Sequence, residues 1–386
     1  MASKCHICNA PLVVNPAASR LSSVTSDCRP WHPIFQPVVC YMCGTVQKVV
    51  SPEWLEDIQN IYSGYQVYYQ GGGAEQKTFD TTGSGVARSV RIVTWLDQTA
   101  ELSGNGTLLD IGCGNGAFLS AFQHRYPGWN LTGLELDSRN QDAVCRIPNT
   151  CFFCGSLQDL RQEFDLVVLI HALEHIPVPL TLLKTLATRL KPGGKLLIHV
   201  PNLVLSPFDL LIADHCTHFT YRTLNQLMAS AGWDISAIST DQIPKELSVL
   251  AAFSARHDRG RISLSCPDQN NPVEEGLTLL KNHLAWLQEM WHQALQTNDQ
   301  VCILGSSIAA AWLATAIGTR VKFFLDEDVN RVGKQFMGLP ILSIQDVQEK
   351  IPVLMPLLPD IAKNIIGRYK NRSLQFIPPP GMHADD

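Results

Sequence analysis

The stretch LLDIGCGNG at residues 108–116 decides the fold of this chain. A short apolar strand at residues 107–111 runs into a turn that holds Gly112, Gly114 and Gly116, and a helix follows. Glycines at this spacing let the backbone, rather than a side chain, approach a ligand. The stretch therefore predicts a ligand site between a strand and a helix of an α/β domain.

Strand-like and helix-like stretches alternate around this turn, from about residue 80 to residue 256. Such alternation predicts a parallel sheet with crossover helices. The expected strands are 107–111, 129–135, 164–170, 195–200 and 246–254, and the expected helices are 117–125, 180–190 and 224–231. The second strand ends in Glu135, an acid placed to accept both hydroxyls of a ribose.

The first 70 residues have a different composition and too little apolar material to form a core unaided. They carry two C-x-x-C pairs, Cys5/Cys8 and Cys40/Cys43. Four thiolates in two such turns are typical of a tetrahedral zinc site that stabilises folding, although iron accepts the same donors and four free thiols are the alternative. We therefore expect a zinc-binding module at residues 1–70, with Cys28 as a spare thiol.

The last third of the chain predicts another α/β unit. A polar linker at 256–272 precedes an amphipathic helix at 273–296, and a strand, turn and helix follow at 300–316. Gly305 stands alone where a dinucleotide-binding loop has three glycines. We therefore expect three domains, at residues 1–70, 71–256 and 257–386, the last being a degenerate Rossmann-like α/β domain with a scaffold or lid role.

Composition excludes several classes of function. The chain has 386 residues with 45% hydrophobic and 17% charged side chains, which suits several soluble domains. Its net charge of -5 argues against nucleic-acid binding. No apolar run approaches the roughly 20 residues of a membrane span, and the N-terminus lacks the apolar core of a signal peptide. We expect a cytoplasmic protein with no membrane or nucleic-acid partner, and the sequence indicates no oligomeric state.

The segment D-x-G-x-G-x-G from Asp110 to Gly116 resembles motif I of class I S-adenosylmethionine-dependent methyltransferases. Three later segments resemble that family's next strands, loops and closing helix in the same order: EFDLV with HALEHIPVP (163–179), LKPGGKLLIHVPN (190–202) and HFTYRTLNQLMASAGW (218–233). The resemblance implies a Rossmann-like fold and S-adenosyl-L-methionine as cofactor. It implies that the three glycines, next to Asp110, line the methionine end, that Glu135 holds the ribose, and that Ser156 and Leu157 lie beside the adenine.

Two histidine-bearing loops follow the predicted strands at the edge where ligands of such folds bind. They contain His171, Glu174 and His175 after the fourth strand, and Asp214, His215 and His218 further along. A sulfonium methyl donor needs little covalent help, so the protein must hold the acceptor in line and remove a proton. His175 and His215 are candidates for this base, with Asp214 orienting His215, and hydrogen bonding to the backbone is the alternative. We expect His171 beside the cofactor and His218 bonded to the backbone.

The whole order of segments resembles the deoxysugar C-methyltransferases that act on nucleotide-linked keto sugars. CYMCGTVQ (40–47) and YSGYQVYY (62–69) resemble that family's second cysteine knuckle and tyrosine segment. The resemblance implies that His215 removes a proton next to a ketone while a tyrosine, Tyr65 or Tyr68, assists. The chain departs from the family in two places: Asp214 stands for its Glu, and PKELS at 244–248 replaces its His-Gly-Gly-Ser.

Three classes of function stay open at this point. The first is a small-molecule methyltransferase, with C-methylation of a nucleotide-linked keto sugar as its sharpest form and O- or N-methylation as its neighbour. The second is a macromolecule methyltransferase, for which the cations in residues 1–70 are few. The third is a non-catalytic cofactor-binding protein, against which the intact glycines argue. We expect a small-molecule acceptor.

Overall fold

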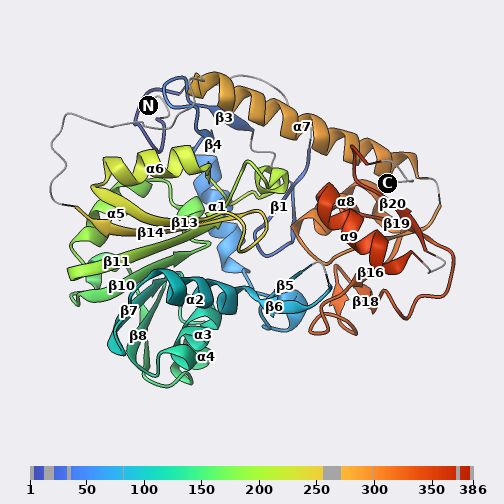
Figure 1. Cartoon of the computed structure of the whole chain (residues 1–386). Helices are drawn as coiled ribbons and strands as arrows, with labels where there is room; N and C mark the ends of the chain where they lie inside the picture. The colour runs from blue at the N-terminus through green and yellow to red at the C-terminus, as the bar shows by residue number, and fades with distance from the viewer. Residues whose placement is uncertain are drawn as a thin grey trace.

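A computed structural model describes residues 4–12, 21–32, 36–80, 82–254, 271–297, 299–370 and 374–382. Two α/β lobes lie side by side beneath the long helix α7 (Pro272–Gln296), and the N-terminal segments run between them (Figure 1). Most of the predicted linker at 256–272 falls outside the described residues. Among the residues described, no helix is both long and apolar enough to cross a membrane.

The first lobe is built on a seven-stranded sheet with the order β13-β14-β11-β10-β7-β8-β9. Its strands are β7 (Asn105–Ile111), β8 (Gly128–Glu135), β9 (Thr150–Cys154), β10 (Phe164–Ile170), β11 (Leu190–Pro201), β13 (Trp233–Ser239) and β14 (Glu246–Phe253). The strands from β11 to β9 are parallel, whereas β14 runs antiparallel to both of its neighbours. The chain reverses its winding direction between β7 and β10, and ligands of such sheets bind at this switch point.

Helices cover both faces of this sheet, since successive residues of a buried strand point to opposite sides. Val167 of β10 joins the core under α5 and α6, whereas Val168 joins the core under α2, α3 and α4. The helices are α2 (Arg88–Thr99), α3 (Ala117–Arg125), α4 (Gln141–Cys145), α5 (Pro179–Ala187) and α6 (Tyr221–Ser230). The predicted parallel sheet with crossover helices is therefore confirmed.

The largest difference from the predicted boundaries lies between α5 and β11. Strand β11 begins at Leu190, and α5 already ends at Ala187, so the predicted helix at 180–190 is too long. The reason lies in tertiary pairing, because Leu190 pairs with Phe164 at the start of β10. Strand β13 and helix α2 have no counterpart among the predicted elements.

The second lobe is a six-stranded sheet with the order β17-β18-β16-β15-β19-β20. Its elements are β15 (Val301–Leu304), α8 (Ile308–Ile317), η5 (Gly318–Arg320), β16 (Val321–Asp326), β17 (Gln335–Phe336), β18 (Leu339–Ser343), β19 (Pro352–Leu354), α9 (Pro359–Tyr369) and β20 (Gln375–Ile377). The expected Rossmann-like α/β character is confirmed. In the turn after β15, Ser306 donates to Asp326 at 2.6 Å and Arg331 donates to the Ser306 carbonyl at 2.9 Å. The turn thus satisfies its polar groups internally.

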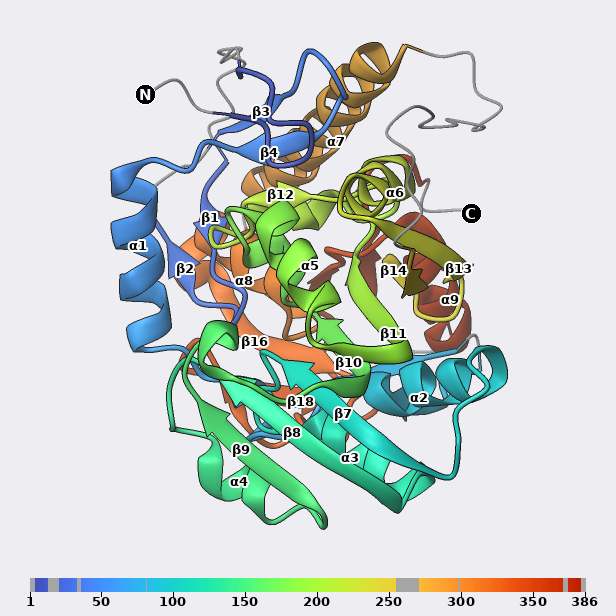
Figure 2. The same ribbon diagram turned by 90° about the vertical axis from the view of Figure 1, so that its left-hand side faces the viewer.

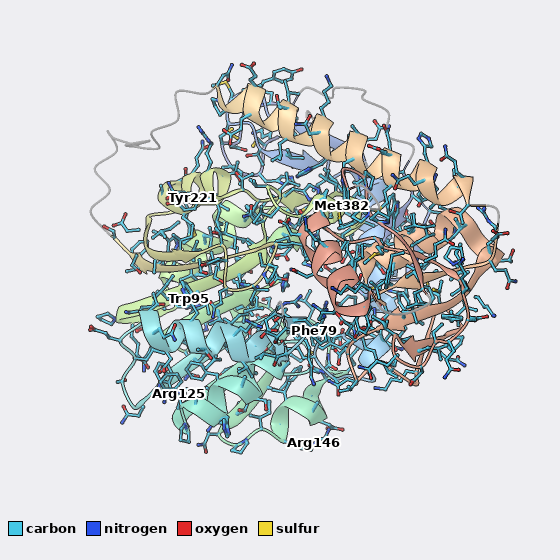
Figure 3. All side chains as sticks on the ribbon, turned by 45° about the vertical axis from the view of Figure 1, so that its right-hand side comes forward. Phe79, Trp95, Arg125, Arg146, Tyr221 and Met382 are labelled. Atoms are coloured by element: carbon cyan, nitrogen blue, oxygen red, sulfur yellow. The ribbon has the colours of Figure 1, made fainter. Side chains whose placement is uncertain are left out.

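The N-terminal segment connects the two lobes. Strands β3 (Pro37–Val39) and β4 (Val46–Lys48) form a sheet with β12 (Thr217–His218), which comes from a loop of the first lobe (Figure 2). The hairpin of β1 (Ser23–Val24) and β2 (Pro30–Trp31) contacts α8 instead. Helix α1 (Pro52–Ser63) follows, and the small hairpin of β5 (Lys77–Phe79) and β6 (Gly85–Ala87) leads into α2. Phe79 of this hairpin lies between the lobes (Figure 3).

Candidate active site

The loop between β7 and α3 brings backbone close to a neighbouring carboxylate. Gly112, Gly114 and Gly116 all adopt positive φ, at 73°, 53° and 81°. A side chain at Gly116 would be strained by its positive φ, and its Cβ would lie 2.7 Å from Cδ1 of Ile147. The amide of Gly114 donates to Glu135 Oε1 at 2.7 Å, which fixes the turn against the end of β8.

Two carboxyl groups at the ends of β7 and β8 lie in a weakly solvated environment. Asp110 is 2% exposed, and its Oδ1 has no hydrogen-bond partner among the described residues. Burial, reinforced by the charge of Glu135, raises the pKa of Asp110 to about 8. Burial also raises the pKa of Glu135. Because an unpartnered buried oxygen is costly, this pair fits a ligand that supplies hydroxyl or amino hydrogens.

The tyrosine segment, residues 62–73, is held against the glycine loop. The side chain of Asn115 donates to the Gly73 carbonyl at 2.7 Å, and Arg139 donates to the Tyr62 carbonyl at 2.8 Å. Both donors follow strands that end at the ligand-binding edge of the sheet. Segment and loop therefore face each other across that edge.

Two loops at the same edge bring His175 and His215 together. One loop contains η3 (Leu173–His175) after β10, and the other follows η4 (Pro207–Leu211) after β11. The two rings are 4.5 Å apart and nearly perpendicular, at 89°. His175 Nδ1 lies 3.0 Å from the Asp214 carbonyl, and His215 Nδ1 lies 2.6 Å from Asp209 Oδ1. Within the described part of the chain, neither Nε2 has a hydrogen-bond partner.

The carboxylate that holds His215 is Asp209, and the expectation that Asp214 orients this ring is wrong. The Asp214 carboxylate instead accepts the Ser26 amide at 2.8 Å and lies 3.4 Å from His175 Nδ1. Asp209 also binds His218 Nδ1 at 2.7 Å, so His218 bonds to a carboxylate and not to the backbone. Although burial opposes the effect, His218 and His215 hold the pKa of Asp209 well below its usual value.

Glu174 joins the histidine pair to His171. It is 1% exposed, its Oε1 lies 3.1 Å from His171 Nδ1, and its Oε2 has no partner among the described residues. Single donor atoms of Glu174, His175 and His215 lie within 4.8 Å of one another. Burial lowers the pKa of His175, so this imidazole is neutral near pH 7 and able to accept a proton.

A second cluster of similar composition surrounds Glu246. Arg88 contacts Glu246 Oε1 at 2.9 Å, His199 Nε2 lies 2.5 Å from Oε2, and His171 Nε2 lies 3.4 Å from Oε1. Although burial alone would lower it, the charge of Glu246 raises the pKa of His171 to about 9. His171 is therefore a cation at neutral pH. The segment that replaces His-Gly-Gly-Ser supplies Glu246, and pairing of β11 with β14 is what brings it to His199.

One ring of the tyrosine segment lies close to the histidine pair. Tyr62, which the sequence did not single out, has its ring 6.2 Å from His175 and 5.8 Å from Tyr65. Burial raises the pKa of Tyr65, and burial, opposed by Arg88, raises the pKa of Tyr68 to about 12. These phenols are therefore neutral hydrogen-bond donors at neutral pH.

The four cysteines form a compact cluster. The sulfurs of Cys5 and Cys43 lie 3.5 Å apart, as do those of Cys8 and Cys40, and all four lie within 4.8 Å of one another. Backbone amides of Ile7 and Met42 donate to two of these sulfurs at 3.4 Å, an arrangement that stabilises thiolates. Sulfurs bound to one tetrahedral zinc ion lie about 3.8 Å apart, so the donor set fits such an ion.

The cysteine module also supports the second histidine loop. His6 lies between two of the cysteines in sequence. Its Nδ1 is 2.7 Å from Thr217 Oγ1. Strand β4 pairs with β12 in the same place. The module therefore positions the residues next to His215.

Comparison with known proteins identifies the kind of domain that the first lobe contains. Residues 87–238 match a family model described as a methyltransferase domain. The match spans the glycine loop, Glu135 and both histidine loops. These residues form a class I S-adenosylmethionine-dependent methyltransferase domain. This domain is built on the seven-stranded sheet, in which β14 runs antiparallel to both of its neighbours.

The methyltransferase domain is also what this chain shares with curated relatives. Ubiquinone biosynthesis O-methyltransferases are 31% identical over 122 residues in Pseudomonas paraeruginosa and 30% over 116 residues in Coxiella burnetii. Each alignment covers 28% of this chain, and the chain spans about half the length of these relatives, 50% and 48%.

Solved structures resemble the chain over less than half of its length. One is the mitomycin 7-O-methyltransferase MmcR, with 18% identity, a TM-score of 0.38, and coverage of 45% of this chain and 54% of that chain. Another is CalO1, a methyltransferase of calicheamicin biosynthesis in its SAH-bound form, with 19% identity, a TM-score of 0.34, and coverage of 43% and 54%.

The predicted cofactor residues of the methyltransferase domain gather at one edge of the sheet. Ser156 and Leu157, at the start of η2 (Leu157–Asp159), follow β9 next to Glu135, whose carbonyl accepts the Gly155 amide at 2.9 Å. The turn with three glycines, the unpartnered Asp110 oxygen and the terminal Glu135 together fit S-adenosylmethionine. Their individual roles stay predictions.

Proposed function

We propose that the chain is a methyltransferase that uses S-adenosylmethionine to methylate a small molecule after a histidine removes a proton from it. The sharpest form of the proposal is C-methylation of a nucleotide-linked keto sugar. The observation that carries it is the His175/His215 pair, in which each Nδ1 is bound and each Nε2 is free. The pair lies at the edge of the sheet where the glycine loop also lies.

The chain's own residues bind the cofactor and cover it. The cofactor, when bound, supplies an electrophilic methyl group. Gly112, Gly114 and Gly116 with Glu135 hold it, and Asp110 accepts a hydrogen bond from it. The tyrosine segment covers the glycine loop and limits the access of water.

His215 acts as the base in this proposal. Asp209 accepts the Nδ1 hydrogen of His215, which leaves the lone pair on Nε2 and stabilises the imidazolium that forms. His175 and Asp214 line the same position, and Tyr65 or Tyr68 donates a hydrogen bond to the developing enolate oxygen. In the N-terminal module, Cys5, Cys8, Cys40 and Cys43 hold a structural zinc ion.

O-methylation is the second candidate, because the curated relatives are named O-methyltransferases. A hydroxyl acceptor needs the same base as a carbon acceptor. A neutral amine does not, since its lone pair is already available.

The test is transfer of label from isotopically labelled S-adenosylmethionine to a panel of nucleotide-linked keto sugars, with mass spectrometry of the product. We expect label on a sugar carbon. His215→Gln should lower turnover by about 10²–10⁴-fold, the usual contribution of a general base. His124→Gln, an exposed histidine of α3, is the matched control. Label on oxygen would select the second candidate, and undiminished turnover of His215→Gln would refute the base.

A further inference from the structure

We propose that Glu174, His175 and His215 form a second divalent-metal site, distinct from the four cysteines, and that Zn²⁺ bound there stops proton removal. The binding of the ion follows from the geometry alone. Its inhibitory effect rests on the proposed function, because it requires His215 to be the base.

The donor set is complete and close together. One donor atom from each of the three residues lies within 4.8 Å of the other two. Donors bound to one zinc ion at 2.0–2.2 Å lie roughly 3–4 Å apart, so small side-chain movements close the site on an ion. Two histidines and one glutamate leave a fourth position of a tetrahedral ion for water.

The ring nitrogens of the two histidines that would not bind the ion are already bonded as in metal centres. Histidine ligands almost always donate their second ring nitrogen to a carboxylate or a backbone carbonyl. Both versions are present: His215 Nδ1 contacts Asp209 at 2.6 Å, and His175 Nδ1 contacts the Asp214 carbonyl at 3.0 Å. These contacts leave the lone pairs on Nε2.

Glu174 provides the independent sign of a missing ligand. Its side chain is only 1% exposed, and Oε2 has no hydrogen-bond partner in the described part of the chain. A carboxylate oxygen in such a place is costly unless a cation or a donor reaches it. A divalent ion between Glu174 and the two imidazoles removes this cost.

The surrounding charges also favour a cation. The buried carboxylates of Asp209 and Asp214 lie directly behind the two histidines. Two buried cations lie nearby: Lys48 donates to the Ile212 carbonyl, and His171 contacts Oε1 of Glu174 and is shared with Glu246, which leaves Oε2 of Glu174 for the ion. Three carboxylates around two imidazoles therefore attract a divalent ion.

Binding of the ion and proton removal by His215 exclude each other, because both use the Nε2 lone pair of His215. A proton from the acceptor has no place to go while the ion is bound. Zinc should therefore inhibit turnover and compete with the acceptor.

Binding is tested first on the full chain that already holds one zinc ion in its cysteine site. Titration calorimetry and metal analysis should show a second equivalent of Zn²⁺. With Co²⁺, the second equivalent should lack the thiolate-to-cobalt charge-transfer band, since its ligands are nitrogen and oxygen. Glu174→Gln and His175→Ala should each weaken the second equivalent at least 10-fold, whereas His124→Ala should not.

Thermal melts and S-adenosylmethionine binding of each variant show whether it is folded, and Glu174→Gln keeps the shape of the side chain. A wild-type chain that takes up a single equivalent overturns the site. A second equivalent that is unchanged in both folded variants overturns it as well. These measurements need no acceptor, so they decide the site even if the proposed function fails.

Turnover then tests inhibition. At free Zn²⁺ ten times its dissociation constant, the rate should fall about 10-fold, and a chelator weaker than the cysteine site should restore it. Turnover that rises with Zn²⁺ would refute inhibition and make the ion part of the catalytic apparatus.

Discussion

Two clusters of this molecule have the same composition, two histidines and one glutamate, and differ in what their polar atoms contact. Around Glu246, both carboxylate oxygens are taken by Arg88, His171 and His199. Around Glu174, one buried carboxylate oxygen, Oε2, has no partner among the described residues. The first cluster engages both oxygens of its carboxylate, whereas the second leaves one carboxylate oxygen open to a proton, an ion or a substrate.

The comparison teaches that residue types alone do not identify a reactive site. A buried carboxylate whose two oxygens both contact cationic or imidazole groups is costly to remove. A cluster with free lone pairs carries an energetic cost until a ligand arrives. The closed cluster, around Glu246, should therefore govern stability. The open cluster, around Glu174, should govern chemistry.

Removing the charge of the closed cluster should have the largest effect. Glu246→Gln removes the carboxylate that contacts Arg88 and leaves His171 with Glu174 alone, so the free energy of unfolding should fall by about 3–5 kcal/mol. Denaturant titration measures this. A loss below about 1 kcal/mol would mean that the closed cluster is not a structural ion pair.

In the open cluster, the next effect should come from the positioning residue Asp209. Asp209→Asn presents an amide to one of the two histidines and removes the charge that stabilises the imidazolium. Turnover should fall about 100-fold, or about 2.7 kcal/mol, with unchanged S-adenosylmethionine affinity. A steady-state assay with a calorimetric binding control checks this, and a shift in the pH profile separates positioning from mere destabilisation. Wild-type turnover with an unshifted profile would contradict the role.

The third largest effect should be a pH dependence of the free energy of unfolding, which comes from the closed cluster. His171 has its pKa raised from about 6.5 in the unfolded chain to about 9 in the fold. A raised pKa stabilises the fold fully below pH 6.5, and that stability is lost as pH rises through 9. The difference in stability between the wild type and His171→Gln should therefore shrink between these values, by about 2–3 kcal/mol. A difference independent of pH in denaturant titrations would show that His171 is not charged in the fold.

The smallest effect concerns the outer contact of the closed cluster. Ser248 Oγ lies 2.7 Å from His199 Nδ1. Ser248→Ala removes one buried hydrogen bond and should cost about 1 kcal/mol of stability without changing turnover. Thermal melts and the labelled-methyl assay together measure both, and a loss of turnover would connect the closed cluster to the chemistry.

Much of the architecture was predictable because its signals are local. The glycine loop, the alternation of strands and helices, and the paired cysteines are patterns of contiguous residues, and the structure has the sheet, the turn and the sulfur cluster that they predict. The end of α5 was less predictable, because pairing of Leu190 with Phe164 overrides a helical pattern.

The hydrogen-bond partners of the histidines were not predictable from the sequence. Asp214 precedes His215 in sequence, yet adjacent side chains in a loop point in different directions, and η4 brings Asp209 to the ring instead. Ser26, which binds Asp214, lies 188 residues away from it. Glu246 meets His199 only because β14 pairs with β11.

The sequence by itself determined the order of secondary structure, the methyltransferase class of the first lobe and the residue types at each loop. Periodicity and spacing within a few residues carry that information. Only the tertiary structure decided which carboxylate serves which histidine and which lone pairs stay free. Hydrogen bonds form between atoms that folding brings together, and here those atoms come from loops far apart in the chain.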